Sequence, residues 1–314
     1  MAHRAAGGTW IDDGPPAPSH VDASAIAIAA SPNRVQVAWY NGATLHSAHL
    51  EGTTWVHDGG DLTIDPATTN PLGYQPHAID LAFDGDMPYL ASWESNAAGS
   101  NVFVRYWNGS GWIYVGGAVD GSGSANQDPS IAIDTDGTIY VALTRVANGA
   151  EVFVYRWTGS AWQIVGDELG FISGQPALSP VIEIIGGRPT VAFLEPIIPG
   201  HYDLHVRQWD GTQWNTLMHG IRNEYEVRDH ELAGDGDVPY LVWTEIGNTF
   251  SHLTRRIAHY NAATNYWAAL GTWSHNMSSD GQACALTITD GVPFTAYRDD
   301  FGGGYVPVRV LALE

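Results

Sequence analysis

The sequence predicts an all-β protein built from repeated four-stranded units, and three observations support that prediction. The chain of 314 residues has 36 glycines, 13 tryptophans and 14 tyrosines, and only 15% of its residues are charged. Glycine is typical of tight turns and aromatic side chains favour strands, so this composition indicates a turn-rich β protein. A segment with a glycine turn followed by a tryptophan recurs along the chain. Between its copies, apolar stretches meet at Asp-Gly or Gly-Gly pairs, as β-hairpins do.

The clearest repeat is an alternating strand, a glycine-centred turn, a tryptophan and a second short strand. It reads NVFVRYWNGSGWIYVGG at 101–117, EVFVYRWTGSAWQIVGD at 151–167 and DLHVRQWDGTQWNTLMH at 203–219. Weaker copies lie at 44–60 and 257–272. The tryptophans that follow the turns are spaced 50 to 57 residues apart, and they are Trp55, Trp112, Trp162, Trp214 and Trp267. We expect these tryptophans to pack between neighbouring units, because large aromatic side chains dominate buried contacts.

Each of these segments follows a predicted hairpin of two apolar strands. DLAFDGDMPYLASWE at 80–94 and ELAGDGDVPYLVWTE at 231–245 match closely. The second strand is apolar along nearly its whole length, which suits a strand that is covered on both faces. The predicted unit therefore has four strands, A to D. A Gly-containing turn joins A to B, and an x-G-x-x-W turn joins C to D.

The sixth unit is divided between the two ends of the chain. Its A, B and C strands finish at 306–314 without a D strand, while AGGTWIDDG at 6–14 matches EGTTWVHDGG at 51–60, which makes Trp10 the sixth turn tryptophan. A repeat period of about 40–50 residues is typical of propellers. The chain therefore resembles the six-bladed β-propeller superfamily, with sialidase-like and fucose-lectin-like architecture.

This resemblance implies an all-β fold of four-stranded antiparallel blades with three-plus-one closure, in which the N-terminal strand completes the last blade and removes a free sheet edge. Trp10 is then expected to lie opposite residues 308–313. One domain covers 1–314, and its blades are expected at 23–60, 75–117, 128–167, 178–219, 228–271 and 282–314 together with 7–14.

The charge balance excludes several kinds of partner. Thirteen arginines, no lysines and 34 acidic residues give a net charge of −21, which opposes binding to nucleic acid or to an anionic bilayer. No apolar run approaches the ~20 residues of a membrane-spanning helix. The single cysteine, Cys284, excludes an intrachain disulfide. We expect a partner that is a small polar ligand or a glycan; the sequence leaves the oligomeric state open.

The N-terminal region shows no signal peptide, because residues 1–30 lack a basic segment followed by an apolar core of ~7–15 residues. We expect a secreted or periplasmic protein present as a mature chain, with a cytoplasmic location as the alternative.

The candidate site lies on one rim of the expected propeller. In such a fold the B–C loops and the D–A crossovers share a rim, and in this chain both sets are long and irregular. Function concentrates in irregular loops on a regular scaffold. The last residues of the expected B strands form one column along this rim: Asn41, Glu94, Arg145, Glu195, Glu245 and Asp299.

The four carboxylates of this column are the candidate catalytic residues and also the candidate metal ligands: Glu94, Glu195, Glu245 and Asp299. Clustered carboxylates can hold Ca²⁺ or can raise one another's pKa for acid–base chemistry. No cofactor is certain, and Ca²⁺ is the candidate. The alternative interpretation is that these charges simply end their strands in water.

Aromatic faces and planar donors suit the recognition of a sugar. The candidate ligand-binding residues near the same rim are Tyr40, Trp93, Arg145, Arg228, Arg298 and His77. By contrast, Arg105, Arg156 and Arg207 recur on expected C strands, and we expect them on the outer surface of their blades.

The sequence leaves the choice between binder and enzyme open. The first hypothesis is a propeller that binds a carbohydrate or similar polar ligand over its central channel, on the loop-rich face. The alternative is a hydrolase or lyase, Ca²⁺-assisted or not, that uses the carboxylate column. A protein-interaction scaffold is the third hypothesis.

Overall fold

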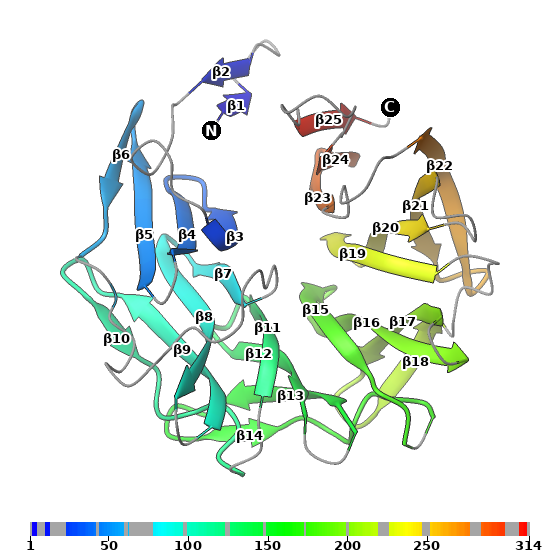
Figure 1. Ribbon diagram of the computed structural model, residues 1–314, viewed down its shortest axis with the longest axis horizontal. Helices are drawn as coiled ribbons and strands as arrows, with labels where there is room; N and C mark the ends of the chain where they lie inside the picture. The colour runs from blue at the N-terminus through cyan, green and yellow to red at the C-terminus, as the bar shows by residue number, and fades with distance from the viewer. Residues whose placement is uncertain are drawn as a thin grey trace. The chain divides into compact units, whose positions relative to one another are not determined.

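The computed structural model describes most of the chain as strands and short turns. The described residues are 2–4, 10–12, 23–41, 44–59, 62, 78–96, 99–122, 126–146, 149–172, 174–198, 201–218, 226–246, 252–276, 284–298 and 308–312. Within them every regular element is a β-strand, so the predicted all-β class is confirmed (Figure 1). None of these residues forms a helix of the length and hydropathy needed to cross a membrane.

Two compact units divide the chain. The first comprises Met1–Ala147 with Tyr155–Ile164, and the second comprises Asn148–Val154 with Val165–Glu314. The predicted single domain over 1–314 stays a prediction.

The first unit contains three four-stranded antiparallel sheets, the third of which holds the boundary between the units, and a short hairpin. The first sheet orders β3 (Ala23–Ala30), β4 (Val35–Asn41), β5 (Thr44–Glu51) and β6 (Thr54–His57). The second orders β7 (Ile79–Asp84), β8 (Met87–Asn96), β9 (Gly99–Trp107) and β10 (Trp112–Tyr114). The third orders β11 (Asn126–Ile133), β12 (Ile139–Arg145), β13 (Glu151–Trp157) and β14 (Trp162–Ile164). The inner strands β3, β7 and β11 lie side by side (Figure 1).

The second unit contains two further four-stranded sheets and one of three described strands. The fourth sheet orders β15 (Leu178–Ile185), β16 (Arg188–Ile198), β17 (His201–Trp209) and β18 (Trp214–Met218). The fifth orders β19 (Glu226–Asp235), β20 (Val238–Ile246), β21 (His252–Asn261) and β22 (Tyr266–Asn276). The last orders β23 (Cys284–Thr289), β24 (Val292–Arg298) and β25 (Val308–Ala312). Here β15, β19 and β23 are the neighbouring inner strands.

The short hairpin holds the region of Trp10. It consists of β1 (Ala2–Arg4) and β2 (Trp10–Asp12), and Arg4 pairs with Trp10 across it. The predicted closure, in which Trp10 lies opposite residues 308–313, stays a prediction.

The second strand of each four-stranded sheet is covered on both faces, as the sequence predicts. Consecutive residues of a strand point to opposite faces, so two adjacent fully buried residues show cover on both sides. The adjacent pairs with no exposed surface are Val37 and Ala38, Leu90 and Ala91, Val141 and Ala142, Val191 and Ala192, and Leu241 and Val242. Turns containing Gly85 and Gly236, with φ of +58° and +59°, connect two of these strands to the inner ones.

The turn tryptophans contact an aromatic side chain across their own hairpins. Ring centroids lie 5.3 to 5.9 Å apart in the pairs Trp107–Trp112, Trp157–Trp162, Trp209–Trp214 and Tyr260–Trp267. The interplanar angles are nearly constant, at 52° to 55°. The same local contact therefore recurs in four sheets.

The predicted packing of turn tryptophans between neighbouring sheets is confirmed for Trp162, Trp214 and Trp267. The indole Nε1 of Trp162 donates a hydrogen bond to the carbonyl oxygen of Val115, at 3.1 Å. Trp267 makes the equivalent bond to the carbonyl oxygen of Leu217, at 3.0 Å. Val115 directly follows the outer strand of the preceding sheet, and Leu217 lies near the end of such a strand. We call this contact the inter-sheet junction.

A glycine completes the inter-sheet junction. Gly116 has φ of +71°, and a Cβ atom built there would lie 2.6 Å from the ring of Trp157 in the next sheet. Gly166 has φ of +69°, and its Cβ would lie 2.6 Å from Trp209. Only glycine combines this backbone conformation with so close an approach.

Candidate functional site

The inner strands are irregular at the rim where the B strands end. The register shifts between Ala23 and Ala25, Gln127 and Ser130, Leu178 and Val181, and Val227 and Asp229. At two of these bulges a non-glycine residue has positive φ, Asp128 at 51° and Ser179 at 52°, and a proline follows it. Bulges at sheet rims re-aim side chains, often next to sites. This irregularity supports the loop-rich rim as the candidate site.

Glu94 forms a buried ion pair with Arg105. Its Oε1 lies 2.6 Å from Nη1 of Arg105, and the two residues are 6% and 3% exposed. The Ser92 hydroxyl donates to the same oxygen at 2.9 Å and accepts from Arg105 Nη1, also at 2.9 Å. On its other side the guanidinium donates to the hydroxyl of Tyr114 and lies 4.1 Å from that ring's centroid. A buried charge needs such pairing, and Glu94 holds β9 and β10 in place through Arg105.

Tyr40 and Trp93 lie beside this ion pair. The Tyr40 hydroxyl donates to the backbone oxygen of Trp93 at 3.1 Å. Burial raises the pKa of Tyr40 far above its usual range; the negative charge of Glu94 adds to the increase, while Arg105 opposes it. Tyr40 is therefore a neutral donor. The structure thus brings three predicted site residues, Tyr40, Trp93 and Glu94, into one place.

Arg145 is held in a fixed orientation and remains partly exposed. Its Nε lies 3.1 Å from Oδ2 of Asp120, and its Nη2 donates to the Tyr155 hydroxyl at 2.7 Å. The arginine side chain is 19% exposed and the aspartate side chain only 5%. Burial raises the pKa of Tyr155 to about 12, although the hydrogen bond from Arg145 acts in the opposite direction. Ser122 donates to Asp120 from both its backbone and its hydroxyl.

Glu195 is fully buried and binds backbone amides. The amide of Phe171 donates to both carboxylate oxygens at 3.0 Å, and that of Ile172 donates to Oε1 at 2.7 Å. Nε2 of His205 lies 3.9 Å from Oε2. The Phe171 ring, with its centroid 4.9 Å from that of His205, covers the group. Glu195 therefore fixes the backbone of the crossover between the third and fourth sheets.

Glu245 has a partner on each oxygen. The indole of Trp243 donates to Oε1 at 2.7 Å, and Nε of Arg256 donates to Oε2 at 2.9 Å. The glutamate side chain is 1% exposed, whereas that of Arg256 is 32% exposed. As with Glu94, an arginine on the neighbouring C strand neutralises the acid at the end of the B strand.

The remaining candidates lie apart from these contacts or beyond the described part of the chain. Arg228 is exposed and pairs with Glu226 at 2.9 Å, and Asn41 is exposed at the end of β4. Arg298 ends β24, where it pairs with Val308. His77 and Asp299 lie outside the described residues. Within the described ranges, no three His, Cys, Asp or Glu side chains are grouped so that they could hold a metal ion.

The sequence analysis did not identify the partners on the C strands. The expectation that Arg105 lies on an outer surface is wrong, because it is buried against Glu94. Arg207 is partly buried: it donates to the carbonyl of Leu169 at 3.0 Å, and its guanidinium lies over the Phe171 ring. Arg156 matches the expectation, since it is exposed and bonds Gln163. Cross-strand pairing gave no signal for the ion pair of Glu94, because Arg105 lies opposite Leu90 and Glu94 lies opposite Asn101, four positions away.

No family model matches this chain, and no curated protein matches it. Solved structures do. The GH93 α-L-arabinofuranosidase of Fusarium graminearum, in complex with arabinobiose, has a TM-score of 0.58 and 11% identity, with 91% of each chain covered. A PL25 ulvan lyase, bound to a glucuronic acid–rhamnose sulfate unit, has a TM-score of 0.58 and 12% identity, with 92% of this chain and 78% of that one covered.

A lectin shares the same architecture. The Aleuria aurantia lectin, in complex with fucosyl-α1-6-GlcNAc, has a TM-score of 0.51 and 12% identity, with 79% of this chain and 77% of that one covered. Likeness at such low identity shows the fold alone. That fold is the β-propeller.

Proposed function

We propose that this protein binds a carbohydrate or similar polar ligand at the loop-rich rim of its sheets. The observation that carries the proposal is Arg145, whose guanidinium is fixed by Asp120 and Tyr155 but keeps an exposed part. A pre-oriented planar donor loses little side-chain freedom when a ligand binds. In the second unit the side chains of Arg228 and Arg256 are also partly exposed, at 35% and 32%.

The solved structures of similar fold support a carbohydrate as the ligand. They include an arabinofuranosidase with arabinobiose, a lyase bound to a uronic acid unit and a lectin with a fucosylated sugar. A net charge of −21 disfavours an anionic polysaccharide unless arginines or a cation intervene. A neutral glycan is therefore the preferred ligand.

A hydrolase or lyase is the second candidate, because two of the three solved structures are such enzymes. A general acid or base must exchange a proton with its substrate. Glu94, Glu195 and Glu245 are instead buried and bonded to partners of their own, which favours positioning roles and hence binding. Their catalytic and Ca²⁺-binding assignments, with Asp299, remain proposals. Two further proposals remain: that β2 completes the last sheet and closes the propeller, and that the protein is secreted or periplasmic.

The test is a glycan array with the purified chain, repeated with Ca²⁺ and with a chelator. Arg145→Met keeps the apolar stem of the side chain and removes the donors, so binding should fall tenfold or more, about 1.4 kcal/mol. Arg156→Met is the matched control, since the Arg156 side chain is exposed and donates to Gln163. Equal effects of the two variants, or a blank array, would refute the proposal, and a chelator effect would support the cation.

A further inference from the structure

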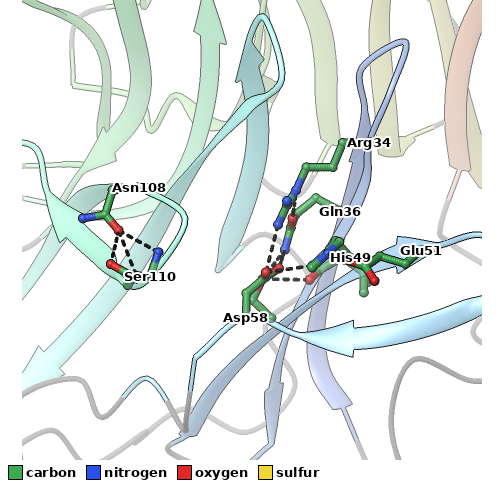
Figure 2. A network of polar contacts seen from close by, with 10 residues as sticks. Arg34, Gln36, His49, Glu51, Asp58, Asn108 and Ser110 are labelled. Atoms are coloured by element: carbon green, nitrogen blue, oxygen red, sulfur yellow. Dashed lines mark hydrogen bonds and ion pairs between the residues drawn. The ribbon is translucent and has the colours of Figure 1, made fainter.

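The turn between β9 and β10 concentrates three donors on one side-chain carbonyl. Oδ1 of Asn108 accepts hydrogen bonds from the amide of Ser110, the hydroxyl of Ser110 and the amide of Gly111, each at 2.9 Å. Figure 2 shows these bonds, with Nδ2 of Asn108 pointing away from Ser110. Asn108 is exposed, and the next residue is Gly109, with φ of +93°.

We propose that Asn108 is a site of spontaneous deamidation. The backbone nitrogen of Gly109 loses its proton to solvent and attacks Cγ of Asn108. The new C–N bond closes a five-membered imide, the bond from Cγ to Nδ2 breaks, and Nδ2 leaves as ammonia. Water then opens the imide at either carbonyl, which gives aspartate or isoaspartate. Water is the only co-reactant, and no atom is oxidised or reduced.

The three donors serve this reaction directly. Attack at Cγ develops negative charge on Oδ1, and donors already aimed at an oxygen on which charge develops lower the barrier. Glycine removes the remaining obstacle: its nitrogen has no neighbouring side chain to shield it, and no heavy atom lies within 4 Å of the position where a Cβ would be. The ammonia leaves from the side that faces away from the turn.

The fifth sheet contains a natural comparison. Asn261 occupies the equivalent turn and its Oδ1 accepts from the amides of Ala263 and Thr264, at 3.0 and 3.3 Å. It lacks the hydroxyl donor, and alanine follows it in the sequence. The methyl group of Ala262 shields the attacking nitrogen, so Asn261 should persist where Asn108 does not.

The fourth sheet has an aspartate, the residue that deamidation would form, at the equivalent position. Asp210 takes the same position, and its Oδ1 accepts from the amide and hydroxyl of Thr212 and from the amide of Gln213, at 2.7 to 2.8 Å. These bonds hold the pKa of Asp210 well below its usual range. An aspartate formed at position 108 would therefore fit its turn and add one negative charge. Isoaspartate would lengthen the backbone and break the same bonds.

The experiment is incubation of the folded chain in ¹⁸O-labelled water at neutral and mildly alkaline pH, followed by peptide mass mapping. The peptide that contains Asn108 should acquire one ¹⁸O and the mass of the acid, faster at higher pH, while that of Asn261 stays unchanged. Ser110→Ala should slow the conversion, because it deletes one donor to Oδ1. Ala262→Gly should make Asn261 reactive as well.

Two results would overturn the proposal. One is an Asn108 peptide that keeps its amide as long as the Asn261 peptide does. The other is equal conversion at both positions in the unaltered chain, which would remove the role of glycine. Gly109→Ala should reduce the rate roughly tenfold or more, or about 1.4 kcal/mol in the barrier. If that variant is unstable, Ala262→Gly tests the same requirement at a turn that already tolerates asparagine.

Discussion

The indole Nε1 of Trp214 donates a hydrogen bond to the backbone oxygen of Val165, 49 residues earlier in the chain, at 2.9 Å. Trp214 itself is 8% exposed and contacts Trp209 across its hairpin. One side chain therefore closes a local turn and also joins the fourth sheet to the strand end of the third.

Replacing Trp214 should destabilise the protein in two separable steps. Trp214→Phe keeps a ring but leaves the Val165 carbonyl without its donor, which should cost about 1–3 kcal/mol. Trp214→Ala also leaves a cavity, for a total of about 3–5 kcal/mol. Denaturant unfolding measures both. Trp55→Phe is the control, because the Nε1 of Trp55 has no hydrogen-bond partner among the described residues; a loss as large as that of Trp214→Phe would contradict the junction's role.

Gly166 should be intolerant of any side chain. Gly166→Ala places a Cβ 2.6 Å from Trp209 and 2.8 Å from the Nε1 of Trp214, at φ of +69°. The clash should cost about 1–3 kcal/mol beyond the backbone strain. Gly211→Ala isolates the strain, since Gly211 has φ of +100° with nothing within 4 Å. Thermal unfolding compares the two variants, and equal melting temperatures would show that strain alone is responsible.

Glu195→Gln should lower stability rather than only function. Whichever way the amide group of glutamine is oriented, its NH₂ would face the backbone amide of Phe171, which is a donor itself. The variant would leave a buried N–H without an acceptor and would lose hydrogen bonds to a charged carboxylate. Together these losses should lower the free energy of unfolding by about 3 kcal/mol. Glu226→Gln is the surface control, where the ion pair with Arg228 is partly exposed. Weaker glycan binding at unchanged stability would instead place Glu195 in contact with ligand.

Tyr155 makes stability depend on alkaline pH. Its pKa is raised to about 12 by burial, against about 10 in an unfolded chain. The folded state thus holds the phenol proton more tightly, and this contribution is fully present below pH ~10 and is lost as the pH rises through the folded pKa. Phenolate absorbance should show several tyrosines titrating late, Tyr40 and Tyr155 among them, and Tyr155→Phe should remove one of these late transitions. Early titration of every tyrosine would show that Tyr155 is accessible to solvent.

The repeats predicted the sheets because turns and strands are local features. Glycine turns and alternating apolar residues specify a hairpin within about a dozen positions, and so the strands fell where the motifs did. Glu94, Glu195 and Glu245 were predicted as the last residues of their strands, but they lie two, three and one residues before the last residue of β8, β16 and β20. Their partners were not predicted, because they come from the lateral pairing of strands and from loop folding. Two amides from the crossover bind Glu195, and no residue pattern encodes backbone donors 23 and 24 residues away.

The first sheet shows the same limit in a different way. Buried Asp58 accepts from Arg34 Nη2 at 2.9 Å and from Gln36 Nε2 at 2.6 Å, and its Oδ1 lies 2.8 Å from His49 Nδ1 (Figure 2). These residues come from a turn, two strands and the end of a third. Their positions in the sequence do not indicate a network, because the four side chains meet around one carboxylate only in the folded chain.

The inter-sheet junction bears on how such a chain can arise by duplication. The tryptophan belongs to one sheet, whereas the carbonyl and the glycine that receive the aromatic rings belong to the sheet before it. A single sheet copied without its neighbours would contain an indole that lacks its carbonyl acceptor and a glycine that lacks the tryptophan ring packed against it. Stability in repeat proteins resides in such nearest-neighbour terms as much as in the repeats. The unit that duplication must keep intact is therefore the inter-sheet junction. A recombination breakpoint inside a sheet would preserve this junction.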